Sequence, residues 1–304
     1  MIETLPTQIQ VVEVSPRDGL QNEKTHISTE QKLVLLARLV AAGCTRIEAT
    51  SFVNPHKVPQ MADAEALCER LPALDQVRYT GLILNERGYR RLRDTSLHEA
   101  GLVVPATDTF GIRNQGLNVA DAVAMATEVI RDGVQTGFPV QATIAVAFGC
   151  PFEGDVTASA VIDIAEALAA AGPVELALAD TVGVAVPTQV YRLFSELQAQ
   201  LTPLPLRAHF HNTRNTGIAN AYAAMQAGVS ILDASMGGIG GCPFAPNASG
   251  NIATEDLLYM LQRGGVEHGL QLQTLLEGAA WLEQALGKPV PSMLLKAGVF
   301  PPPV

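Results

Sequence analysis

The sequence has few cysteines and no long apolar run, and each shortage excludes a class of protein. Its four cysteines, Cys44, Cys68, Cys150 and Cys242, lie far apart, which argues against a disulfide scaffold or a structural zinc site and favours a reducing compartment. Charges interrupt apolar stretches such as residues 161–172, so none reaches the ~20 residues that a membrane helix requires. The first residues resemble neither a secretion signal nor a transit peptide. We therefore expect a cytoplasmic protein with no membrane partner.

Basic residues are also scarce. The chain has 20 Lys and Arg against 30 Asp and Glu, a formal net charge of −10. Nucleic-acid binding requires a basic surface, so we expect no nucleic-acid partner. A phosphorylated small ligand remains compatible, because a local basic group or a helix N-terminus can hold one. Hydrophobic residues make up 48% of the 304 residues, enough for a large core and too many for a disordered chain.

Short β-type runs recur along the chain between longer helical patterns. These runs are continuous apolar or β-branched stretches, which are typical of strands buried on both faces of a parallel sheet. The sequence predicts eight strands, at residues 10–14, 46–51, 78–84, 101–105, 141–147, 175–179, 207–210 and 230–234.

Amphipathic stretches lie between several of these strands. Residues 29–42 are predicted to form a helix with Ser28 or Thr29 as its N-cap. Stretches 120–133 and 157–171 follow the same pattern. The apolar face of the first helix is expected to consist of Leu33, Leu36, Ala37 and Val40.

The alternation predicts an α/β fold, a (β/α)8 TIM barrel. Eight strands in 304 residues give about 38 residues per unit, close to what such barrels use. A doubly wound sheet is the alternative, but it usually carries a Gly-rich fingerprint after its first strand, where this chain has the polar segment 15–23. No linker divides the chain. We expect one catalytic domain over residues 1–304, with the barrel at about 8–262 and a helical segment at about 270–304.

Two histidines end the predicted seventh strand. His209 and His211 are two residues apart, so both imidazoles project from one face of the strand. They are either a hydrogen-bonded pair or ligands of a divalent ion. Asp18, at the end of the first strand, favours the metal site, because two imidazoles and a carboxylate can hold an ion with open positions. No thiolate lies at metal spacing, which favours Mg²⁺ or Mn²⁺.

Further polar residues lie where a barrel places its functional groups, at the C-terminal ends of strands. Arg17 next to Asp18 is either a surface ion pair or a group that holds a developing oxyanion. The glycine-rich segment 236–241 leads into Cys242 and suits an active-site cover. Cys242 is either a small buried residue or a proton donor and acceptor.

Five motifs, in order along nearly the whole chain, resemble the 3-hydroxy-3-methylglutaryl-CoA lyase family. That family belongs to a group of metal-dependent TIM barrels that also includes Claisen-type condensing synthases. The motifs are residues 11–23 with the core RDGLQNE, 47–61 (IEATSFVNPHKVPQM), 148–154 (FGCPFEG), 179–187 (ADTVGVAVP) and 238–261 (GIGGCPFAPNASGNIATEDLLYML).

The resemblance implies a retro-Claisen cleavage of an acyl-CoA thioester to acetyl-CoA and a ketoacid, within leucine catabolism. It implies that Arg17 stabilises the enolate oxygen, that Cys242 is the acid/base of its loop and that Glu48 and Glu255 support the site. Lys24 and Asn22 are candidate contacts for coenzyme A. The implied ligands of the divalent ion are Asp18, His209, His211 and Asn251, of which Asp18 and His209 are also expected to take part in catalysis.

The chain departs from the family pattern near the histidines. Asn212 and Arg214 stand where the family typically has Asp and Tyr, and Ala177 stands where it commonly has Ser. Such changes alter which acyl chain fits, so a related branched or longer 3-hydroxyacyl-CoA stays open as the substrate.

Two other functions were weighed against the lyase. A condensing acyltransferase of the same superfamily is disfavoured by the Cys242 loop and by the short chain after the barrel. A non-catalytic barrel is disfavoured because Arg17, Asp18, His209, His211 and Cys242 are all present. Since barrels of this kind often self-associate, we expect a homodimer.

Overall fold

The computed structural model describes residues 5–241 and 250–301. Eight parallel strands form a closed barrel in chain order, with the last strand paired to the first. The strands are β1 (Gln10–Glu13), β2 (Arg46–Ser51), β3 (Arg78–Ile83), β4 (Glu99–Pro105), β5 (Val140–Ala145), β6 (Leu176–Asp180), β7 (Leu206–Phe210) and β8 (Ile231–Ala234). This confirms the predicted TIM barrel, and each strand lies within two residues of its predicted bounds.

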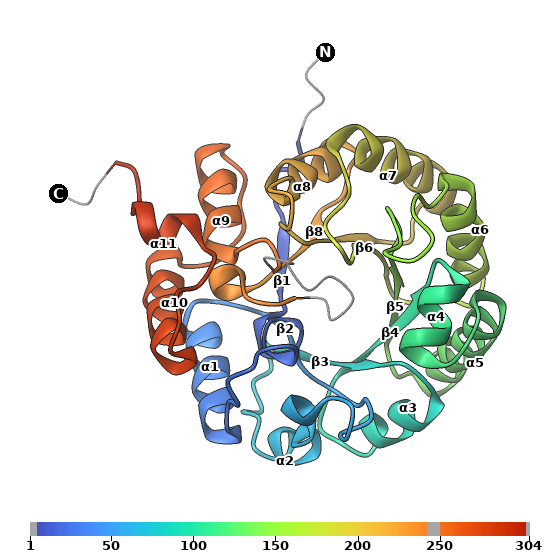
Figure 1. Cartoon of the computed structure of the whole chain (residues 1–304), viewed down its shortest axis with the longest axis horizontal. Coiled ribbons are helices and arrows are strands. Elements are labelled where there is room, and N and C mark those ends of the chain that lie inside the picture. Colours follow the sequence, from blue (N-terminus) through green and yellow to red (C-terminus); the bar gives the residue numbers. More distant parts are fainter. Residues whose placement is uncertain (1–4, 242–249, 302–304) are drawn as a thin grey trace.

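Helices surround the strand ring, as Figure 1 shows. In the part of the chain that the structure describes, no helix is both long and apolar enough to cross a bilayer. The helices are α1 (Thr29–Ala41), α2 (Ala64–Cys68), α3 (Glu86–Arg93), α4 (Asp108–Gln115), α5 (Val119–Thr136), α6 (Ala158–Ala169), α7 (Pro187–Leu201), α8 (Gly217–Gln226), α9 (Thr254–Arg263), α10 (Leu272–Leu286) and α11 (Met293–Ala297). Three short turns accompany them: η1 (Ser15–Gly19), η2 (Pro59–Met61) and η3 (Met236–Gly238).

The start of α1 follows its prediction, but its buried face does not. Ser28 caps the helix in a capping box with Gln31, which satisfies the first free N–H groups. The buried residues are Lys32, Leu35, Leu36 and Leu39, whereas Ala37 is exposed and Leu33 and Val40 are half-buried. The helix is rotated toward Lys32 because the Lys32 ammonium pairs with Asp63 at 2.5 Å.

The inside of the barrel is unusually polar. Inward-facing positions on β2, β4, β6, β7 and β8 or beside them carry buried charged side chains. They are Arg46, Glu48, Glu99, Glu175, Arg207, His209 and Asp233. Because buried charges are tolerated only when they are paired, these residues join in one network of ion pairs, and this network forms the base of the site described next.

Candidate active site

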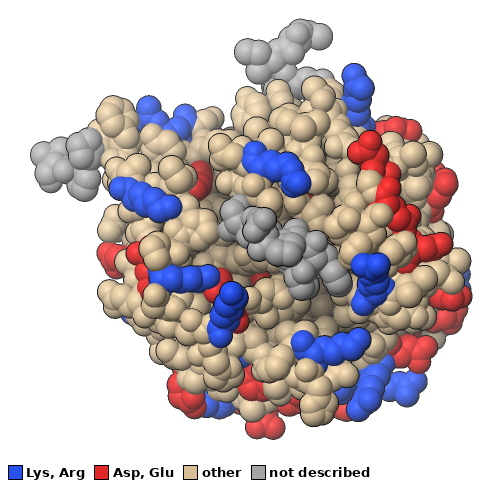
Figure 2. Space-filling model, in the orientation of Figure 1, with Lys and Arg blue, Asp and Glu red and all other residues tan. Residues whose placement is uncertain are grey.

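A cavity opens at the C-terminal ends of the strands. One wall is apolar and comes from β3, β4 and β5 with the adjoining loops, through Leu82, Leu84, Val103 and Ala145. The opposite wall is polar and comes from η1, β7 and β8. Figure 2 shows the face over the barrel, with Lys and Arg side chains around its hollow centre and most visible acidic side chains toward the edge. An apolar wall facing convergent polar groups is typical of a binding site.

Arg17 and Asp18 are delivered to the cavity by η1, the tight turn that directly follows β1. Arg17 donates from Nη1 to Asp18 Oδ1 at 2.6 Å and from Nε to Glu48 Oε2 at 2.7 Å. Glu48 reaches Arg17 from β2 beside a register irregularity between Glu48 and Thr50, a feature that commonly re-aims side chains near active sites. Burial opposes ionisation of Asp18, but the Arg17 guanidinium and the His211 and His209 imidazoles together outweigh it and hold the pKa of Asp18 well below its usual range.

Asp18, His209 and His211 converge at one point of the polar wall. Asp18 Oδ2 lies 3.9 Å from His209 Nε2 and 3.6 Å from His211 Nε2. The three ligand atoms are all within 4.8 Å of one another, a spacing that a single cation can bridge. The two rings come from alternate positions at the end of β7, as the sequence predicted. These three residues form a possible metal site.

Asn251 lies beside this group and offers an unused oxygen. Its Nδ2 donates to Asp18 Oδ2 at 2.8 Å and to the Ile239 carbonyl at 3.1 Å. Its Oδ1 is buried and has no hydrogen-bond partner among the described residues. A buried acceptor without a partner is costly, so a cation beside Asp18 would satisfy it. The donor set of carboxylate, imidazole and amide oxygen therefore fits a divalent ion.

Asp233, which the sequence analysis missed, orients His209. Its Oδ2 lies 3.0 Å from His209 Nδ1, which leaves Nε2 directed toward Asp18. Burial opposes ionisation of Asp233, but Arg207, His209 and Arg46 together outweigh it and lower the pKa of Asp233. A carboxylate on the far nitrogen is the usual way in which a metal-binding imidazole is oriented.

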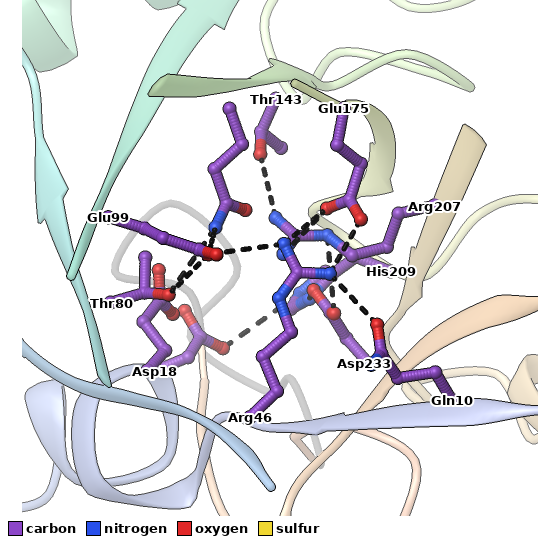
Figure 3. A network of polar contacts seen from close by, with 12 residues as sticks. Gln10, Asp18, Arg46, Thr80, Glu99, Thr143, Glu175, Arg207, His209 and Asp233 are labelled. Carbon is purple, nitrogen blue, oxygen red and sulfur yellow. Dashed lines mark hydrogen bonds and ion pairs between the residues drawn. The ribbon is translucent and has the colours of Figure 1, made fainter. Parts of the chain in front are cut away.

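The ion pairs extend from the site to the base of the barrel, as Figure 3 shows. One group of ion pairs holds Arg17, Asp18 and Glu48, and a second holds Arg46, Arg207, Glu99, Glu175 and Asp233. His209, which lies between Asp18 and Asp233, joins the two groups. The exposed Arg78 approaches Glu99 at 3.9 Å. An excess of buried negative charge is unfavourable without a counter-charge, and a bound dication would supply it.

The segment after β8 packs against the site through glycines and buried carboxylates. Gly237 N donates to both carboxylate oxygens of Glu255, at 3.0 and 3.1 Å, and burial raises the pKa of Glu255 to about 8. Gly240 has φ +127°, and a Cβ there would lie 2.5 Å from Asn251 Nδ2, so this position requires glycine. Cys242, the predicted acid/base, lies outside the described residues.

Of the two candidate coenzyme contacts, Asn22 lies at the cavity and Lys24 does not. Asn22 lines the cavity and donates to the Gly241 carbonyl at 2.6 Å, which joins the loop after β1 to the segment after β8. Lys24 is exposed and is not among the cavity-lining residues.

The departures from the family pattern have identifiable contacts. Arg214 donates to the Val182 and Gly183 carbonyls at 3.1 and 2.8 Å, and Asn212 accepts from Gly217 N. Both therefore fix the loops after β6 and β7. Ala177 is fully buried on β6, between its register partners Thr143 and Arg207.

Known proteins resemble the chain over almost its full length. The HMGL-like family model matches residues 8–281. The "(R)-citramalyl-CoA lyase" of Chloroflexus aurantiacus is 43% identical, with 96% of both chains covered. "Hydroxymethylglutaryl-CoA lyase YngG" of Bacillus subtilis is 38% identical, over 96% of this chain and 97% of its own. A solved HMG-CoA lyase from Acinetobacter baumannii, in complex with coenzyme A and 3-methylmalate, is 39% identical with a TM-score of 0.93, and 98% of both chains is covered.

Proposed function

The chain belongs to the HMGL-like family of carbon–carbon lyases, and we propose that it cleaves a 3-hydroxyacyl-CoA thioester by a metal-dependent retro-Claisen reaction. The observation that carries this proposal is the convergence of Asp18, His209 and His211 beside Arg17 in one cavity. The relatives named above are all lyases, which favours cleavage over condensation.

The residues suited to hold the divalent ion are Asp18, His209, His211 and Asn251. Their oxygen and nitrogen donors fit Mg²⁺ or Mn²⁺. A bound dication supplies Lewis-acid stabilisation of the substrate oxygens and a template that orients them.

The protein's own groups carry the charge and proton changes. A base at the site takes the proton of the 3-hydroxyl. The electron pair left on that oxygen forms the C=O bond of the ketone, and the C2–C3 bond breaks. The electrons of that bond pass into the acetyl-CoA enolate, whose oxygen is stabilised by the Arg17 guanidinium. One such donor stabilises the transition state of the reaction by about 3 kcal/mol. Cys242 then returns a proton to C2 and completes acetyl-CoA.

Glu48 and Asp233 act as positioning residues in this scheme. Glu48 holds the Arg17 guanidinium at 2.6–2.7 Å from its own carboxylate, and Asp233 holds the His209 ring. Charged donors that are fixed before the reaction stabilise developing charge without reorganisation. The coenzyme A tail would lie across the mouth, where Lys and Arg side chains surround the hollow (Figure 2).

Two acyl groups are candidates. 3-Hydroxy-3-methylglutaryl-CoA would give acetyl-CoA and acetoacetate, and the hydroxymethylglutaryl-CoA lyases among the relatives favour it. Citramalyl-CoA would give acetyl-CoA and pyruvate, and the 43% identical relative favours it. The two differ by one methylene between the carbinol carbon and the carboxylate.

The test is cleavage of both thioesters by the purified protein with Mn²⁺, Mg²⁺ or EDTA present. We expect acetyl-CoA plus the matching ketoacid from at least one thioester, and loss of this activity in EDTA. Cleavage of neither thioester, or equal cleavage in EDTA, would refute the proposal.

A further inference from the structure

The base of the cavity holds an arginine that the proposed reaction does not use. Arg207 lies two residues before His209 on the same face of β7, which places it about 7 Å deeper in the barrel. It is 95% buried, yet it is one of the residues that line the cavity, together with Thr143 and Asp233. Its guanidinium is therefore accessible to a group that enters from the site.

Arg207 lies in the same network as Arg46 (Figure 3) but is held less tightly by its partners. Arg46 makes four hydrogen bonds, at 2.6–3.3 Å, to Gln10, Glu99 and Glu175, and it does not line the cavity. Arg207 makes a single hydrogen bond among the described residues, from Nη2 to Thr143 Oγ1 at 3.3 Å. Its Nη1 lies 3.2 Å from Glu175 Oε1 and its Nε lies 3.4 Å from Asp233 Oδ1, both longer than the 2.6 Å pair between Arg46 and Glu175.

Ala177 allows Arg207 to take this position. Ala177 on β6 is the register partner of both Thr143 on β5 and Arg207 on β7. The bond from Arg207 to Thr143 therefore passes across position 177, where the side chain is a single methyl group. A larger residue there would occupy the path of the guanidinium.

A planar guanidinium with five N–H donors, held here only by contacts of 3.2–3.4 Å, is suited to bind a further carboxylate. On the basis of the proposed function, we propose that Arg207 recognises the carboxylate of the acyl group and selects acid-bearing 3-hydroxyacyl-CoA thioesters over neutral ones. Arg207 is thus a specificity-determining residue, while Arg46 in the same network is structural.

Two matched substitutions test this proposal, Arg207→Lys and Arg46→Lys. Both keep the charge and disturb the same network, but one faces the cavity and the other does not. The measurement is kcat/KM for the acid thioester that the enzyme cleaves, divided by kcat/KM for 3-hydroxy-3-methylbutyryl-CoA. In this second thioester a methyl group replaces the carboxylate-bearing substituent on C3. We expect R207K to lower this ratio by about 10- to 100-fold, the value of a hydrogen bond to a charged group. R46K should leave the ratio unchanged while lowering the Tm.

Thr143→Val is a second variant, and it keeps both the charge and the shape of the base of the cavity. It removes the acceptor that holds Arg207 across Ala177, and it should lower the ratio by about 5-fold, the value of one typical intramolecular hydrogen bond. If R207K folds and its ratio is unchanged, the proposal is overturned. If R207K does not fold, an unchanged ratio in T143V overturns it. A wild-type enzyme with no preference for the acid thioester would overturn it as well.

Calorimetric titration with 3-methylmalate in Mn²⁺ separates this inference from the proposed function. If the wild-type protein cleaves no thioester, the function proposed above fails, but the titration still measures carboxylate recognition. Weaker binding by at least 10-fold in R207K, with unchanged binding in R46K, supports the role of Arg207. Equal binding in both variants, or no binding by the wild type, contradicts it.

Discussion

Asp233→Asn should weaken metal binding without unfolding the protein. Asp233 Oδ2 lies 3.0 Å from His209 Nδ1 and holds the ring so that Nε2 is directed toward Asp18. Loss of such an orienting partner typically lowers metal affinity by about 10- to 100-fold, which corresponds to about 1.4–2.7 kcal/mol. An asparagine oxygen still accepts from Nδ1–H, so we expect a value near the lower limit.

Calorimetric titration with Mn²⁺ at pH 7.5 measures this effect. Asp132→Asn is the matched control, because Asp132 is a carboxylate that accepts from Tyr89 Oη on the outer surface of the barrel. D132N should bind Mn²⁺ as the wild type does. A D233N protein that keeps its far-UV CD spectrum and binds Mn²⁺ with wild-type affinity would refute the assignment of Asp233 as an orienting residue.

Three other substitutions test the segment after β8. Cys242→Ser should slow turnover by about 10²–10⁴-fold, the contribution of one acid/base group, with unchanged Mn²⁺ affinity; loss of Mn²⁺ binding would contradict this role. Glu255, with its pKa raised by burial to about 8, binds its proton more tightly in the folded state, so stability should fall as pH rises from about 4.5 to 8. In Glu255→Gln the free energy of unfolding, measured in urea, should change less between pH 5.5 and pH 8. The same change as in the wild type would contradict the role given to Glu255. Gly240→Ala, where a Cβ would displace Asn251, should cost about 1–3 kcal/mol of backbone strain and weaken Mn²⁺ binding; a wild-type Tm would be inconsistent with this.

The barrel could be predicted from the sequence because its strands are continuous apolar runs separated by helical patterns. The bounds predicted for β2 agree with the structure, and other ends shift by one or two residues, since hydrogen-bond partners on neighbouring strands decide where pairing stops. The buried face of α1 could not be predicted. Lys32 is charged, and its partner Asp63 is 31 positions away in the sequence, so only the tertiary structure shows that its charge is paired.

The proximity of Asp18, His209 and His211 could be predicted because local spacing and strand-end position indicate it. His209 and His211 alternate at the end of β7, and Asp18 follows β1. Arg207 and Asp233 were missed because single charges inside short strands resemble solvent-exposed residues. One signal was present: Arg207 precedes His209 by two residues, so it shares the inward face of a strand predicted to be buried on both faces.

The most direct test of the account is anomalous scattering from Mn²⁺ in crystals of the protein. We predict one strong peak bonded to Asp18, His209 and His211, with Asn251 Oδ1 as a fourth ligand. A peak elsewhere, or none at this position under conditions in which the protein is active, would contradict it.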